Sequence, residues 1–218
     1  FTDVSDQFGE HRHLFGMSHT FGDYDLDGAM DFYVIGMSST TARRLESLGI
    51  GPSDKPEHNA LRAAMGYGNR MFLRRGDGYE LAPFNDQVAR SGWSWGTSTF
   101  DFDNDGDRDI FVANGHLSGN STADYCTTFW RHDIYTDDSQ DNAARENMFQ
   151  FVMSPLQETD ISWNGYEHKV LWMNEGDGAF TNVAYLFGVA FEYDGRAVVT
   201  EDLDADGNVD LLVVEYKS

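Results

Sequence analysis

Short apolar runs, separated by polar and glycine-containing segments, dominate this chain. Three of these runs, at residues 32–35, 110–113 and 211–214, consist of aromatic, β-branched and other apolar side chains. Runs of this length and composition between turn-forming segments are typical of buried β-strands. The pattern predicts an all-β fold in which each of the three runs is a buried strand.

Two further segments predict β-hairpins. Residues 70–80 and 169–180 each contain two stretches with apolar residues on either side of a Gly-Asp-Gly sequence. Asp and Gly tolerate the positive φ angles of tight turns, so this sequence between apolar runs favours a hairpin. Strand runs and hairpins alternate along the chain, which indicates a repeated structural unit.

The same acidic pattern, D-x-D-x-D-G-x-x-D, precedes each of the three apolar runs. It occupies residues 23–31, 101–109 and 202–210. Carboxylates this close together repel one another unless a cation neutralises them, and calcium takes about 6–8 oxygen ligands from carboxylates, carbonyls and water. We therefore predict three calcium loops, with side-chain ligands at the first, third, fifth and ninth positions and a further ligand at the seventh. The predicted ligands are Asp23, Asp25, Asp27, Ala29, Asp31, Asp101, Asp103, Asp105, Asp107, Asp109, Asp202, Asp204, Asp206, Asn208 and Asp210.

These loops differ from EF-hands. An EF-hand needs a bidentate Glu at its twelfth position, where the three loops have Val34, Val112 and Val213. Magnesium fits less well than calcium, because it prefers few carboxylates and retains its water shell. About three calcium ions are therefore expected, each stabilising the connection between two strands, so that binding energy adds to folding energy.

Two long insertions interrupt the repeat, at about residues 38–68 and 116–168. Apolar residues at helical spacing within 41–48 and 58–65 predict two short helices in the first insertion, and a further helix is expected near 141–152 in the second. Insertions of this length are usually functional or disordered, and the many aromatic residues of the second favour an ordered one.

The acidic loops, the Gly-Asp-Gly hairpins and the Phe21-Gly22 pair before the first loop together resemble the FG-GAP/VCBS repeat of integrin α-subunit β-propellers. The Phe-Thr-Asp-Val and Phe-Thr-Asn-Val sequences at residues 1–4 and 180–183 add a resemblance to the cartilage acidic protein (ASPIC/UnbV-associated) group. This resemblance implies a seven-bladed propeller, calcium in the loop between the first two strands of a blade, and a secreted or surface location. It covers roughly residues 1–37, 69–114 and 168–216.

The repeat count sets an expectation for the whole fold. Three loops and two hairpins amount to about three blades, whereas propellers usually have about 4–8. We therefore expect residues 1–218 to form a single partial β-propeller that belongs to a longer polypeptide or a larger assembly. An open arc that pairs its edges with another chain is the alternative, although exposed strand edges favour aggregation.

Charge and hydropathy limit the partners. The chain has 37 acidic and 15 basic residues and a formal net charge of -22, so nucleic acid and anionic membrane surfaces would repel it. No apolar stretch reaches the roughly 18 residues of a membrane span. We expect no nucleic-acid partner and no direct membrane insertion. The expected partner is a protein, a glycan or the remaining blades, in an extracellular, cell-surface or periplasmic setting.

The leading functional hypothesis is a non-enzymatic, calcium-binding scaffold or binding module whose insertions contact the partner. No G-x-S-x-G elbow or phosphate-binding glycine loop occurs. The alternative is a metal-dependent enzyme or enzyme subunit, with chemistry in the 116–168 insertion or at a propeller centre completed by missing blades. His116, Cys126, His132 and Asp133 would be its candidate metal ligands, and a buried apolar role for Cys126 is the competing interpretation.

Overall fold

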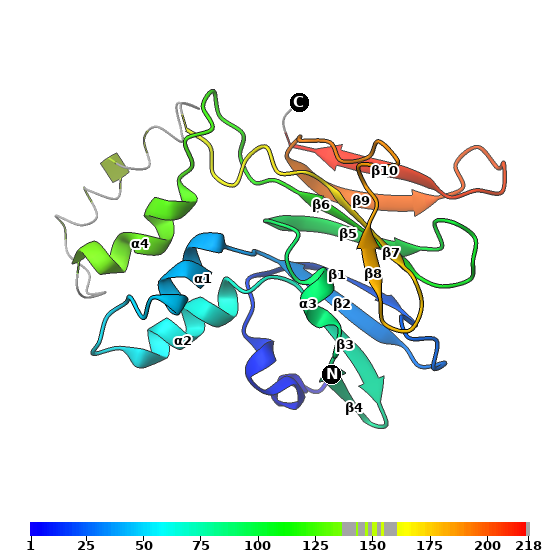
Figure 1. Cartoon of the computed structure of the whole chain (residues 1–218), viewed down its shortest axis with the longest axis horizontal. Helices are drawn as coiled ribbons and strands as arrows, with labels where there is room; N and C mark the ends of the chain where they lie inside the picture. The colour runs from blue at the N-terminus through cyan, green and yellow to red at the C-terminus, as the bar shows by residue number, and fades with distance from the viewer. Residues whose placement is uncertain (137–142, 144–146, 148–149, 152–153, 155–160, 217–218) are drawn as a thin grey trace.

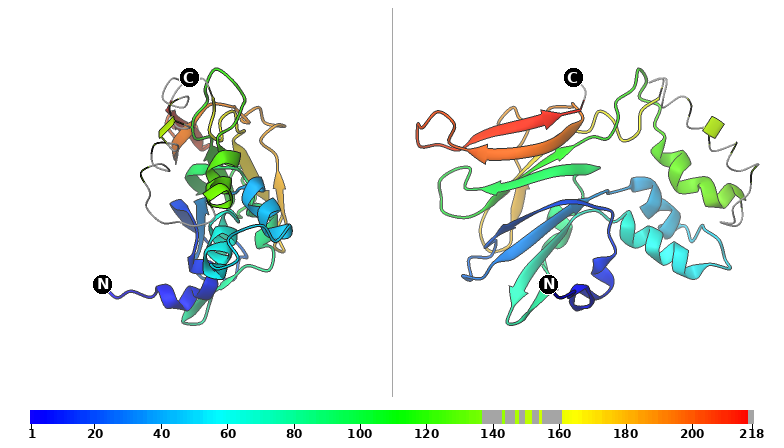
Figure 2. Two further views of the ribbon diagram at one scale, coloured as in Figure 1. Left: turned by 90° about the vertical axis from the view of Figure 1, so that its left-hand side faces the viewer. Right: turned by 180° about the vertical axis from the view of Figure 1, so that it is seen from behind.

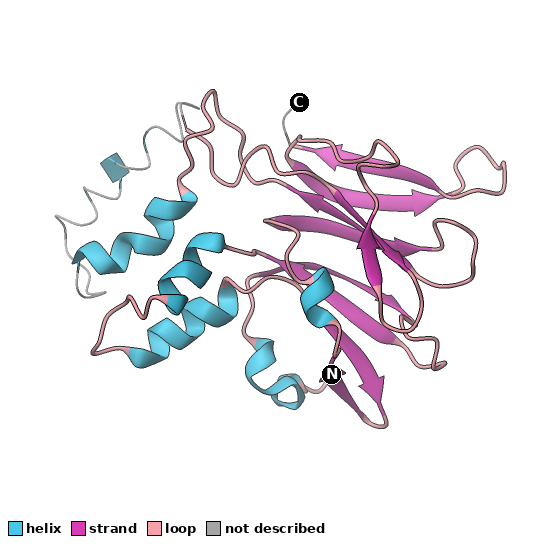
Figure 3. Ribbon diagram, in the orientation of Figure 1, coloured by secondary structure: helices cyan, strands magenta, loops and turns pink. Residues whose placement is uncertain are grey.

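The computed structural model describes the chain except for residues 137–142, 144–146, 148–149, 152–153, 155–160 and 217–218. The described part is mostly β, with antiparallel sheets of four, four and two strands and several short helices (Figures 1 and 3). The sequence predicted an all-β fold, and the structure confirms the coarser part of this prediction, a mostly β fold of antiparallel sheets.

The first two sheets have the same construction, with strands hydrogen-bonded in chain order. The third sheet contains two strands within the described residues, and no closed ring of sheets forms there. The strands of the first sheet are β1 (Gly16–Gly22), β2 (Asp31–Gly36), β3 (Arg70–Arg75) and β4 (Gly78–Leu81). Those of the second are β5 (Ser94–Phe100), β6 (Asp109–Asn114), β7 (Val170–Asn174) and β8 (Phe180–Asn182), and those of the third are β9 (Gly195–Glu201) and β10 (Asp210–Glu215).

The predicted repeat is present in the strand order. The three apolar runs form β2, β6 and β10, and the two predicted hairpins form β3–β4 and β7–β8. Each acidic pattern connects the first two strands of its sheet, giving loop 1 (residues 23–31), loop 2 (101–109) and loop 3 (202–210). The register is equivalent as well, since Val34 pairs with Arg70 and Val112 pairs with Val170.

The helices of the two insertions gather at one end of the sheets, and the three acidic loops lie at the other end (Figure 1). Helices α1 (Thr40–Ser47) and α2 (Pro56–Met65) confirm the two helices predicted in the first insertion. The Ser39 side chain caps α1 by accepting a hydrogen bond from the Ala42 N–H at 3.1 Å, and Pro56 starts α2, where its missing N–H costs nothing.

The second insertion contributes α4 (Cys126–Thr136), which the sequence pattern did not predict. The helix expected near residues 141–152 lies mostly outside the described residues. The described residues also include the 3-10 segment η1 (Ser5–Arg12) and the four-residue helix α3 (Asn85–Val88). None of the helices in the described ranges has the length and apolar character that crossing a membrane requires.

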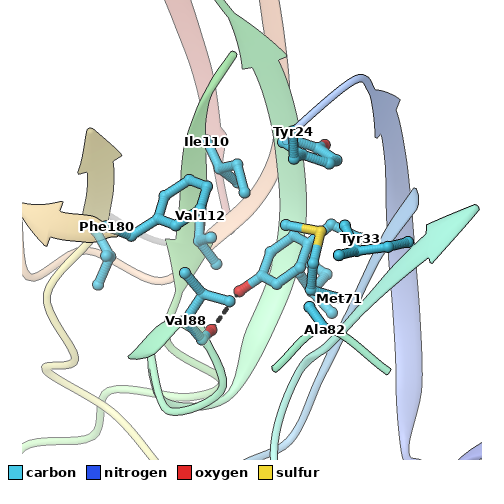
Figure 4. Packing of buried hydrophobic residues seen from close by; sticks show 11 residues of the cluster. Tyr24, Tyr33, Met71, Ala82, Val88, Ile110, Val112 and Phe180 are labelled. Atoms are coloured by element: carbon cyan, nitrogen blue, oxygen red, sulfur yellow. Dashed lines mark hydrogen bonds between the residues drawn. The ribbon is translucent and has the colours of Figure 1, made fainter. Parts of the chain in front are cut away.

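The sheets stack face to face in chain order, so that the first strands β1, β5 and β9 are neighbours (Figure 2). Tyr33 and Met71 of the first sheet pack against Ile110 and Val112 of the second (Figure 4). Strand β6 is buried at every position because its other face packs against the third sheet. This position between two sheets explains why its sequence is continuously apolar.

The third sheet has one covered face within the described residues, so the prediction that residues 211–214 form a buried strand is wrong: a strand forms there, but every second side chain is exposed. Leu211 and Val213 pack toward the second sheet, whereas Val199, Leu212 and Val214 are exposed on the other side. The alternation of exposed and partly buried positions along β10 follows from the two-residue period of a strand.

Candidate metal-binding loops

The three acidic loops share one backbone conformation. The Gly at the sixth position has a left-handed φ of 86°, 96° and 93° in loops 1, 2 and 3. The residue at the fourth position is left-handed too, and here the loops have Leu26, Asn104 and Ala205, with φ between 57° and 62°. Left-handed backbone costs Leu and Ala more than Asn or Gly. The Gly of the repeated acidic pattern suits this left-handed position, but nothing in the sequence pattern indicated the strained fourth position.

The first Asp of each loop holds the turn together. In loop 1 the two oxygens of Asp23 accept hydrogen bonds from the N–H groups of Asp27 and Gly28, at 3.0 and 2.9 Å. Asp101 makes the same two contacts at 3.1 Å each, and Asp202 makes them at 3.0 and 2.9 Å. One hydrogen-bond pattern therefore recurs in three loops whose intervening residues differ.

The fifth and ninth positions add two further recurring contacts. The fifth Asp accepts a hydrogen bond from the N–H of the seventh residue, at 2.9, 3.0 and 2.8 Å in the three loops. The ninth Asp accepts one from the N–H of the second residue, at 2.9, 2.6 and 2.9 Å. These bonds fold the chain so that the carboxylates point into the same turn.

The ninth Asp also connects the loop to the third strand of its sheet. Asp31 accepts a hydrogen bond from the Arg74 N–H at 2.7 Å, and Asp109 accepts one from the Asn174 N–H at 2.9 Å. Both carboxyls are fully buried, and burial raises the pKa of each. Asp210 is exposed. Among the described residues, its carboxylate accepts only the hydrogen bond from within its own loop, donated by the Leu203 N–H.

Each loop collects three carboxylates at one point. In every group, one oxygen from each side chain lies within 4.8 Å of the others, a spacing that suits a shared metal ion. The groups use the first, third and fifth positions in loops 1 and 3, and the first, third and ninth in loop 2. Their members are Asp23, Asp25 and Asp27, then Asp101, Asp103 and Asp109, then Asp202, Asp204 and Asp206.

The remaining predicted ligands lie in the same loops but outside these groups. The structure therefore supports three carboxylate groups that can hold metal ions, and the identity of the ion is a separate question. The residues outside the groups are Ala29, Asp31, Asp105, Asp107, Asn208 and Asp210.

Asp107 makes loop 2 electrostatically unusual. Its side chain is buried, and its Oδ1 atom has no hydrogen-bond partner among the residues that the structure describes. Burial raises the pKa of Asp107 to about 7, and the neighbouring carboxylates of Asp105 and Asp109 raise it as well. A bound dication would relieve this repulsion.

Loop 1 contains a cation of its own, which the sequence analysis missed. The Arg75 guanidinium, from the end of β3, forms ion pairs with Asp25 and with Asp27, the latter at 2.7 Å. The sequence signal for this cation was the alignment of the two predicted hairpins. Arg75 precedes Gly-Asp-Gly in the first hairpin, and Glu175 precedes it in the second.

The residues considered for a transition-metal site are not assembled into one in the described part of the chain. Cys126 is buried, with its Sγ 3.6 Å from the Ser39 hydroxyl, and burial raises the pKa of its thiol to about 11. His116 stacks on Trp93 and Trp95, with ring centroids 4.3 and 5.2 Å apart, and burial lowers its pKa to about 4. The side chains of His132 and Asp133 lie outside the description.

A polar hollow of about 460 Å³ lies where α1 and α4 approach the second sheet, bordered in part by Asp124, Cys126 and Glu167. Glu167 accepts hydrogen bonds from the Trp93 N–H at 2.6 Å and from the Asn164 side chain at 2.9 Å. Burial raises its pKa from 4.5 to about 7. Glu167 therefore joins the second insertion to the first residues of the second sheet.

The raised pKa of Glu167 predicts a pH dependence of stability. Between pH 4.5 and about 7 the folded protein retains a proton that the unfolded chain has released. The contribution is therefore complete below pH 4.5 and is lost as the pH rises through about 7. We expect Glu167→Gln to remove this pH-dependent contribution. The difference in melting temperature, variant minus native protein, should therefore increase by several degrees between pH 5 and pH 8. A constant difference across this range would contradict the assignment.

Comparisons with family models and with curated protein sequences identify no relative of this chain. No family model matches the chain, and no curated protein is detectably similar to it in sequence. The interpretation of the loops therefore depends on their repetition and their geometry.

Proposed function

We propose that this protein is a calcium-binding scaffold or binding module, built from β-propeller blades of the FG-GAP/VCBS kind. The observation that carries the proposal is the threefold recurrence of one loop. In each copy the same backbone hydrogen bonds hold the first Asp, and three carboxylates of the loop lie within 4.8 Å of one another. Three solvated acidic turns would have no reason to share this arrangement.

Calcium is the ion that suits these loops best. Every donor in the three groups is a carboxylate oxygen, and hard dications prefer oxygen ligands. Calcium accepts about 6–8 ligands in a flexible geometry, whereas magnesium requires near-octahedral coordination and holds its water. Three crowded carboxylates on a turn of nine residues fit the flexible coordination of calcium better than the octahedral coordination of magnesium.

The stacking of the sheets supports the propeller part of the proposal. Equivalent first strands, β1, β5 and β9, lie next to one another, and each sheet packs its face on the next. Blades of a propeller are arranged in this way around an axis. The outer face of the third sheet exposes Leu212, Val214 and Tyr216, and we propose that a further blade, in the same polypeptide or in a partner, covers it.

The proposed role is non-enzymatic. The loops are at one end of the sheets and the insertion helices at the other (Figure 1), so the calcium sites stabilise the blades and leave the insertions available to contact a protein or glycan. Extracellular calcium modules work at about 10⁻⁴–10⁻³ M, and this concentration range favours an extracellular, cell-surface or periplasmic location.

A calorimetric calcium titration tests the proposal. We expect saturable binding at about 10⁻⁴–10⁻³ M, and the loss of one ion per chain in each of the variants Asp103→Asn and Asp204→Asn, because each removes the central charge of one group. Magnesium at the same concentrations is the control, for which weaker binding is expected. Absence of saturable binding, or an unchanged stoichiometry in both variants, would refute the proposal.

A further inference from the structure

Loop 1 differs from the other loops in having a basic side chain inside its carboxylate group. The two terminal nitrogens of Arg75 reach two different carboxylates, those of Asp25 and Asp27, and both belong to the three that would hold an ion. The Arg75 side chain is anchored further by its bond to the Arg74 carbonyl at 2.8 Å. A full positive charge thus pairs with two of the three carboxylates that would hold a metal ion.

Loop 2 has the opposite charge at the equivalent position. The register Val34–Arg70 and Val112–Val170 aligns Arg75 with Glu175, and both precede Gly-Asp-Gly. Among the described residues, no basic side chain forms an ion pair with a carboxylate of loop 2. Asp107 adds a fifth acid, 5% exposed; its Oδ1 has no hydrogen-bond partner among the described residues, which is equally true of the Oδ1 of Asp25 in loop 1. Loop 2 contains one basic residue of its own, Arg108, which forms no ion pair with its carboxylates among the described residues, whereas in loop 1 Arg75 pairs with two.

We propose that Arg75 is a built-in counter-ion of loop 1 that competes with calcium, so that loop 2 binds calcium more tightly than loop 1. This inference rests on the proposed calcium-binding function and adds an order of affinities to it. In loop 1 a calcium ion must first displace the guanidinium from two carboxylates. In loop 2 the ion instead relieves repulsion that no ion pair among the described residues neutralises. Loop 1 therefore keeps its turn at calcium concentrations that leave it without the ion.

Removing the guanidinium tests the competition directly. Titration of Arg75→Gln should reveal a calcium site tighter than in the native protein by about tenfold, since exposed ion pairs each contribute modestly and two are lost. The matched control is Arg74→Gln, which makes the same charge change on the neighbouring residue. Arg74 donates to the Gly76 carbonyl at 2.8 Å and packs on Tyr79, and its variant should bind calcium as the native protein does.

A second pair of variants assigns the site to its loop. In the native background Asp25→Asn should leave the tightest calcium site unchanged, while Asp103→Asn, at the equivalent position of loop 2, should remove it. Adding Asp25→Asn to Arg75→Gln should abolish the gained affinity.

The outcomes separate this inference from the proposed function. If the native protein binds calcium in loop 2 but Arg75→Gln behaves like Arg74→Gln, the counter-ion proposal is wrong and the calcium-binding function stands. Equal effects of Asp25→Asn and Asp103→Asn on the tightest site would also overturn it. If the native protein binds no calcium, both proposals fail.

Discussion

Saturating calcium is expected to raise the midpoint of thermal unfolding by about 10–20 °C above its value in EGTA. A ligand present at a hundredfold excess over its dissociation constant stabilises the folded state by about 2.7 kcal/mol per site. For a domain of this size, each kcal/mol shifts the midpoint by about 2–4 °C. Loops 2 and 3, whose carboxylates form no ion pair among the described residues, account for most of the expected shift.

The measurement is a thermal melt followed by circular dichroism, at about 10 mM calcium, roughly a hundredfold above a dissociation constant of 10⁻⁴ M. Ionic strength must be constant, because a chain with a net charge of -22 is also stabilised by general screening. Magnesium at the same concentration should produce a much smaller shift. If calcium binding causes the shift, adding EGTA should return the midpoint to its value without calcium. Melting curves that coincide in calcium and in EGTA would exclude calcium binding.

Replacing Asp109 by Ala is expected to destabilise the protein by about 2–6 kcal/mol even without metal, since each buried donor left without a partner costs about 1–3 kcal/mol. Asp109 is fully buried. Its two oxygens accept hydrogen bonds from the N–H groups of Phe102 at 2.6 Å and Asn174 at 2.9 Å. The substitution removes both acceptors at once and separates loop 2 from β7. Chemical denaturation in EGTA measures the loss.

Asp210→Ala is the matched control, because it changes the same position of loop 3. Asp210 is exposed and accepts one backbone hydrogen bond, from Leu203 at 2.9 Å. We expect its loss to cost about 1 kcal/mol or less. If the two substitutions destabilise the protein equally in EGTA, the role of Asp109 as the connection between loop and third strand is wrong.

The strands and hairpins were predictable because their signals are local. An apolar run such as 110–113 has few alternatives to a buried strand, and Gly-Asp-Gly between apolar runs specifies a turn through backbone φ angles alone. Helices α1 and α2 were predictable for the same reason, from apolar residues at helical spacing. Helix α4 was not, because its burial depends on Cys126 and Trp130 packing against α1, a contact between two insertions distant in sequence.

Some features of the candidate site were likewise predictable from the sequence, and others were not. The order of aspartates within nine residues identified the three loops and their glycine turns, since one turn of backbone brings those carboxylates together whatever surrounds it. Which carboxylates share a group could not be deduced from the sequence, because the ninth Asp accepts an N–H from the third strand in both loop 1 and loop 2, yet it joins the group only in loop 2.

The sequence by itself determined the repeat, the turns and the acidic loops, because each depends on residues close together in the chain. Only the tertiary structure decided the charge balance of each loop. Arg75 reaches Asp25 and Asp27 from a strand that lies after the first insertion, and Asp107 is buried among its acidic neighbours. Electrostatic interactions depend on distance and burial in space, and the chain acquires both only when the strands pair, β1 to β3 for loop 1 and β5 to β7 for loop 2.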